Sequence, residues 1–143
     1  MIQAWLLFSA LSALMAALVA IFGKLGLKNI DSTLATTIRS IVMAVFLIVV
    51  SLSLKKFDNF SFGSMVLKDW LLIVLAGVAG AISWLFYFLA LKSGDATKVV
   101  VIDRMSLVFV AILAFLFLGE TLSWQQIIGV ILMVGGAILV SIF

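Results

Sequence analysis

Three charged residues lie within otherwise apolar stretches of the chain and are the first candidates for chemistry: Arg39, Asp103 and Arg104. A charge in the middle of a bilayer costs about 2.5–3.5 kcal/mol on insertion scales, so such side chains tend to pair or to line wet cavities. Because the side chain of Asp103 is short, we expect it to pair with Arg39 or with a nearby lysine. Each arginine has an alternative role, in which its long side chain extends to the lipid headgroups. The three residues form a predicted ion-pair gate.

A second candidate group recurs at three- and four-residue spacings: Gly77, Gly80, Ser83, Trp84 and Tyr87. In a helix the glycines would make room, the two aromatic rings would contact a solute, and the hydroxyls would orient it, as in a pocket wall. The alternative is helix packing through small residues, with ordinary interior or interfacial aromatics. In the first apolar run, the small residues at positions 9, 13, 16, 17 and 20 indicate close packing rather than binding.

The composition excludes several classes of site. The chain has no histidine, cysteine or proline, which excludes disulfides, thiolate or imidazole metal ligands and catalysis by His or Cys. Paired intramembrane carboxylates and nucleotide-binding motifs are also missing, so we do not expect an enzyme. We expect no metal and no cofactor. The net charge of +3 comes from nine Lys and Arg spread along the chain, so we expect no nucleic-acid partner.

The elements that position these residues are apolar helices. The chain is 66% hydrophobic and only 10% charged, against about 25% charged in soluble domains. Spanning a bilayer takes about 20 apolar helical residues, and the runs 4–23, 70–91 and 121–143 suffice. The runs 40–54 and 105–119 reach that length only if Arg39, Asp103 and Arg104 enter the membrane. We therefore expect an all-α membrane protein, one domain over 1–143, with five transmembrane helices at about 3–25, 32–54, 69–91, 97–118 and 122–142.

The orientation of these helices is nearly undetermined by charge. Five spans put the termini on opposite sides, with three lysines on the N-terminal side (55, 56, 68) and four on the other (24, 28, 92, 98). The positive-inside rule leaves two interpretations: the chain inserts both ways and two copies form an antiparallel dimer, or it inserts once, with the N-terminus outside, beside another chain. Helix direction also places Arg39, Asp103, Arg104 and Tyr87 in one expected polar layer.

Several motifs together resemble the EamA family of the drug/metabolite transporter superfamily. They include Ser83-Trp84-Leu85-Phe86-Tyr87 followed by Gly94-Asp95-Ala96, then Asp103-Arg104-Met105-Ser106, and Leu118-Gly119-Glu120. Each motif is weak alone, but their order and spacing are specific, and the similarity covers nearly the whole chain. The resemblance implies half of a ten-helix, inverted-repeat fold in a multi-pass protein of the plasma (inner) membrane.

The resemblance also implies a function and a set of site residues. Family members are secondary carriers, commonly exporters of amino acids or other small metabolites, with a cavity formed mainly by the first, third and fourth helices of each half. On this chain the matching substrate-binding candidates are Ser83, Trp84, Tyr87, Asp103 and Ser106. With one unit only, we expect an antiparallel homodimer that works by alternating access on a small-molecule substrate, surrounded by membrane lipids. The alternative is a non-transporting membrane subunit that stabilises or regulates a partner chain.

Overall fold

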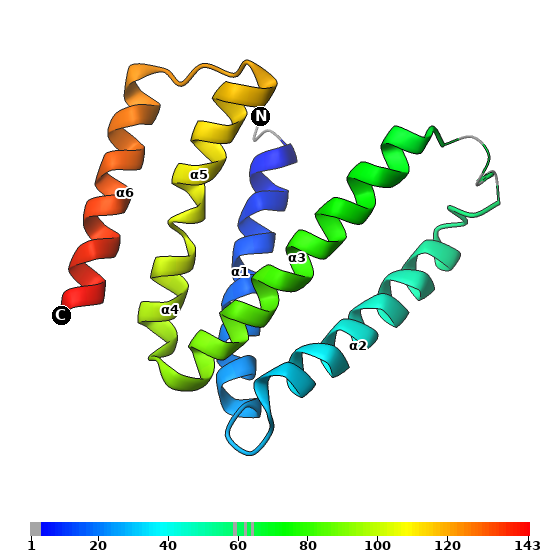
Figure 1. Cartoon of the computed structure of the whole chain (residues 1–143), viewed down its shortest axis with the longest axis horizontal. Helices are drawn as coiled ribbons and strands as arrows, with labels where there is room; N and C mark the ends of the chain where they lie inside the picture. The colour runs from blue at the N-terminus through cyan, green and yellow to red at the C-terminus, as the bar shows by residue number, and fades with distance from the viewer. Residues whose placement is uncertain (1–3, 59, 62, 64) are drawn as a thin grey trace. The chain divides into compact units, whose positions relative to one another are not determined.

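The computed structural model describes residues 4–58, 60–61, 63 and 65–143, which contain helices and no strand. The helices are α1 (Ala4–Gly26), α2 (Ser32–Ser53), α3 (Leu67–Ser93), α4 (Ala96–Asp103), α5 (Ser106–Leu113), the π-helical turn η2 (Ala114–Leu118) and α6 (Trp124–Ile142) (Figure 1). They make five segments long and apolar enough to cross a membrane, with α4, α5 and η2 forming a single span, Ala96–Leu118. The predicted all-α fold with five transmembrane helices is therefore confirmed. The expected start of the first helix at residue 3 lies outside the described residues.

The chain divides into two compact units, and the boundary falls within α1. The central unit is Phe22–Lys92 and holds the last turn of α1 with α2 and α3. The terminal unit combines Met1–Ile21 with Ser93–Phe143 and holds the rest of α1 with α4, α5, η2 and α6.

In the central unit, two lysines join the end of α1 and the α1–α2 connection to the end of α3. Lys24 Nζ donates to the carbonyl oxygen of Leu91 at 2.8 Å, and Lys92 Nζ donates to the carbonyl oxygen of Ile30 at 3.2 Å. The last carbonyls of a helix have no partner within it and carry partial negative charge, so a lysine donor there is favourable. Leu91 is fully buried beside this contact. The helix α2 leads away from this contact and α3 leads back to it, so the two helices are antiparallel (Figure 1).

The start of α2 is fixed by a side-chain cap. Asp31 has extended backbone angles, and its Oδ1 accepts from the backbone N–H groups of Thr33 at 2.9 Å and Leu34 at 3.1 Å. The hydrogen bond from Leu34 is the largest cause of the lowered pKa of Asp31. Desolvation, the second-largest cause, raises this pKa, and the N–H of Thr33 and the positive charge of Lys92 lower it further.

This cap makes helix stability depend on pH. Because the pKa of Asp31 is lower in the folded chain than its ordinary value of 3.8, the cap stabilises above that value and is lost as the pH falls through the folded pKa. We expect the thermal midpoint of helix loss, followed by circular dichroism in detergent, to fall below pH 4 more for the wild type than for Asp31→Asn. Asparagine keeps an acceptor oxygen that does not titrate there. Asp58→Asn, in the α2–α3 connection, is the control and should behave as the wild type; identical acid profiles for all three proteins would contradict the prediction.

In the terminal unit, the span Ala96–Leu118 is not the single regular helix expected over 97–118. α4 ends at Asp103 and α5 begins at Ser106. Between them Met105 N–H donates to Ile102 O at 2.9 Å and Leu107 N–H donates to Arg104 O at 3.1 Å, the i→i+3 pattern of a 3₁₀ turn. The four residues before Asp103 are all β-branched and have lower helix propensity. The expected helix therefore has a tight turn at Arg104.

The ends of the last two helical segments also follow local chemistry. The π-helical turn η2 ends at Gly119, which has a φ of +67° and a backbone N–H that donates to Ala114 O. A left-handed residue is the common way to end a helix, and glycine adopts it without strain. α6 begins at Trp124 rather than at the expected 122, because Ser123 and Gln126 form a reciprocal capping box. α6 then runs opposite to α4 and α5 (Figure 1).

Candidate substrate site

A stack between an arginine and an indole is the central feature of the candidate site. In the central unit, the guanidinium carbon of Arg39 lies 3.6 Å from the ring centroid of Trp84 and 5.4 Å from that of Phe88. Arg39 lies seven residues into α2, or about 10 Å along its axis. A cation–π contact of this kind contributes about 0.5–1 kcal/mol at an exposed site and about 2 when desolvated. The stack therefore holds a positive charge inside a membrane-spanning segment.

The aromatic side of the stack is a cluster of three rings on α3. Trp84 and Tyr87 meet edge to face with centroids 5.4 Å apart, and Phe88 lies 5.9 Å from each of them. The positions i, i+3 and i+4 share one face of a helix, which explains why these side chains meet. Trp84 and Tyr87 are half-buried, whereas Phe88 is only 3% exposed. Phe88 was not among the predicted residues, although its spacing from Trp84 was a signal for it.

The remaining predicted residues lie outside this cluster of rings. Ser83 precedes Trp84 on α3 and is exposed. Asp103 and Ser106 flank the 3₁₀ turn in the terminal unit, and both are exposed. Arg39, Ser83, Trp84 and Tyr87 thus belong to the central unit, and Asp103, Arg104 and Ser106 to the terminal unit. The pairing of Asp103 with Arg39, and the common polar layer, stay predictions.

Arg104 lines a cavity of about 390 Å³ in the terminal unit. The other lining residues come from α1 and are small, apart from one phenylalanine: Phe8, Ser9, Ser12, Ala13 and Ala16. Three members of the small-residue stripe, Ser9, Ala13 and Ala16, therefore border open space beside an arginine. Ser12, which adds a second hydroxyl, was not singled out from the sequence.

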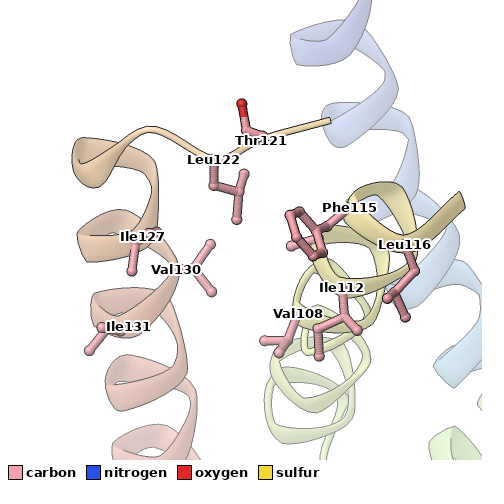
Figure 2. A pocket seen from close by; sticks show the side chains of 10 residues that line it. Val108, Ile112, Phe115, Leu116, Thr121, Leu122, Ile127, Val130 and Ile131 are labelled. Carbon is pink, nitrogen blue, oxygen red and sulfur yellow. The ribbon is translucent and has the colours of Figure 1, made fainter. Parts of the chain in front are cut away.

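A larger cavity, of about 440 Å³, lies between α5, η2 and α6 and is almost wholly apolar (Figure 2). Its walls carry Val108, Ile112, Phe115, Val130 and other aliphatic side chains. Figure 2 shows the hydroxyl of Thr121 directed away from these side chains. A binding site for a polar solute needs a few convergent polar groups to orient its ligand, so this cavity is not the candidate substrate site.

The model of the EamA-like transporter family matches residues 3–142. The chain belongs to this family. An uncharacterized transporter from the cobO 3′ region of Sinorhizobium sp. is 39% identical over the full length of both chains. An uncharacterized transporter of Synechocystis sp. is 29% identical over 92% of this chain, which corresponds to 38% of the Synechocystis protein. No solved structure matches the chain with significance. As a member of the EamA-like family with five spans, the protein is a multi-pass membrane transporter.

Proposed function

We propose that this EamA-like protein is a secondary carrier, working as an exporter, for small metabolites such as amino acids at the plasma (inner) membrane. The observation that carries the proposal is the stack of Arg39 on Trp84, with Tyr87 and Phe88 beside it. A cationic group fixed against aromatic rings within a transmembrane helix is suited to recognising a polar solute. Ser83 is an additional hydroxyl on the same helix.

The working unit in this proposal is an antiparallel homodimer. One observation supports it: the lysines of the expected loops are almost balanced between the two sides, which favours insertion in both orientations. Inverted repeats with a site at their interface are a recurrent transporter architecture. A second copy inserted in the opposite orientation would supply the equivalent of the other repeat.

Alternating access then requires groups that open and close each side. We assign this gating role to Arg39, Asp103 and Arg104, and a share in substrate binding to Asp103 and Ser106. Asp103 and Ser106 flank the 3₁₀ turn at Arg104. Such a turn within a helix is a recurrent position for a hinge, which supports a role for this segment in opening and closing.

The experiment that tests the proposal is reconstitution of the purified chain alone in liposomes, with flux measured for a panel of radiolabelled amino acids and other small metabolites. We expect solute flux without any other protein. We expect Asp103→Asn to lower flux at least about tenfold while leaving the dimer yield unchanged, because the change removes one charge and keeps the side-chain size. Inactivity across the whole panel would contradict the carrier and favour a non-transporting subunit. Full flux by Asp103→Asn would remove Asp103 from the gate.

A further inference from the structure

We infer that Arg39 is the receptor for a carboxylate group of the solute, and that the substrates are therefore small organic acids and amino acids rather than cations or neutral solutes. This inference rests on the proposed function and assigns a ligand chemistry to one residue. It gives Arg39 a contact with the solute in addition to its gating role. Three features of the central unit lead to it.

The first feature is the way the guanidinium is held. With its carbon 3.6 Å from the indole centroid, one face of the group is covered by Trp84. The N–H donors of arginine lie in the plane of the guanidinium, at its edge, so stacking leaves them available. Among the described residues, no buried side-chain nitrogen or oxygen lacks a hydrogen-bond partner. Any guanidinium nitrogen of Arg39 without a hydrogen-bond partner therefore reaches the surface of the helix pair.

The second feature is the charge around Arg39. α2 contains no Asp or Glu, and the acidic residue of α3 is Asp69, in its first turn. Asp69 lies 15 residues before Trp84, about 22 Å along the helix. Asp31 caps the start of α2 through Thr33 and Leu34. The two helices that hold Arg39 thus carry no carboxylate next to it, so α2 and α3 leave its charge open to an anionic ligand.

The third feature is preorganisation. Arginine binds a carboxylate through two parallel N–H···O bonds, and such charge-assisted pairs are stronger in a site with little water. A guanidinium already fixed on a ring loses less conformational freedom when the ligand arrives. The stack therefore makes Arg39 a better carboxylate receptor than a free side chain. A phosphate of a lipid headgroup shares this chemistry, and the experiment separates the two sources.

The test uses Trp84 itself as the reporter. The chain has four tryptophans, so replacing Trp5, Trp70 and Trp124 with phenylalanine leaves Trp84 as the only indole. In detergent without phospholipid, we expect isovalerate to change the Trp84 emission saturably. Isovaleramide, which has nearly the same shape without the charge, should bind at least about tenfold more weakly. Adding Arg39→Gln should weaken isovalerate binding at least about tenfold, the effect expected when a hydrogen bond to a charged group is lost.

Two further variants test whether the effect is specific to the Arg39 guanidinium. Lys56→Gln removes the same charge from the loop between α2 and α3 and should leave isovalerate binding unchanged. Arg39→Lys keeps the charge without the planar guanidinium. Its affinity for isovalerate should therefore lie between that of the wild type and that of Arg39→Gln. Equilibrium binding of radiolabelled isovalerate to the unmodified chain and to Arg39→Gln gives the same comparison without replacing any tryptophan.

The outcomes separate this inference from the proposed function. Equal binding of acid and amide, or unchanged binding in Arg39→Gln, would overturn the carboxylate site. A Trp84 response to phosphatidylglycerol vesicles but not to isovalerate would overturn it in favour of a headgroup site. Flux in liposomes without preference for carboxylates would overturn the inference and leave the carrier intact. Carboxylate binding that depends on Arg39, without flux of any solute, would support the site and contradict the carrier.

Discussion

Replacing Trp84 with leucine is expected to raise the KM of solute flux in proteoliposomes about tenfold or more. The change removes the ring that lies 3.6 Å from the Arg39 guanidinium and the edge-to-face partner of Tyr87 at 5.4 Å. Leucine keeps apolar volume against α2 but has no π-system. The loss of a desolvated cation–π contact, about 2 kcal/mol, together with the aromatic pairing, accounts for an effect of this size.

Two variants show whether the aromatic face is the cause. Trp84→Phe keeps a smaller aromatic ring and should raise the KM less than Trp84→Leu does. Trp70→Leu makes the same substitution at the start of α3, far along that helix from Trp84. It should change the KM less than twofold. A KM for Trp84→Leu equal to that of the wild type would mean that the stack stabilises the Arg39 charge in the membrane but does not contribute to solute binding.

The five spans were predictable because the length and hydrophobicity of a helix that crosses a membrane depend only on consecutive residues in the sequence. Three apolar runs are long enough to cross a bilayer, and two more reach that length once Arg39, Asp103 and Arg104 are included; charged or capping residues such as Lys24, Asp31 and Ser123 bound the spans. Charged positions such as Arg39 could be recognised as unusual for the same reason. Membership of the EamA-like family was also predictable, because the resemblance depends on the order of short motifs in the sequence.

The partner of Arg39 was not predictable from the sequence. In a soluble helix, the apolar face tells which side meets the protein, but lipid tails are as apolar as a protein interior, so hydrophobicity does not identify the face of α2 that meets α3. The sequence thus places Arg39 and Trp84 in spans without saying which faces meet. The 3₁₀ turn at Arg104 was missed for a different reason. Its neighbours are compatible with a helix, and only the β-branched residues at 99–102 weaken it.

A close approach of α1 to α3 in the central unit gives the prediction with the largest expected effect on stability. A Cβ added at Gly23, near the end of α1, would lie 3.1 Å from Leu91 Cδ2 and 3.3 Å from Phe88 Cζ. Leu91 is 0% exposed and Phe88 is 3% exposed, so neither side chain has free space into which to move. Phe88 also packs 5.9 Å from Trp84. Crowding at Gly23 therefore reaches the ring that holds Arg39.

We expect Gly23→Leu to lower the free energy of unfolding by about 1–3 kcal/mol, the usual cost of overpacking, and to shift the fluorescence of Trp84 in the single-tryptophan chain. The matched control is Gly26→Leu, on the same helix, where an added Cβ meets nothing within 4 Å; it should be close to neutral. Thermal unfolding of the three proteins in one detergent measures the difference. Equal midpoints for Gly23→Leu and Gly26→Leu would contradict the close approach of α1 and α3, because only a tight crossing distinguishes the two glycines.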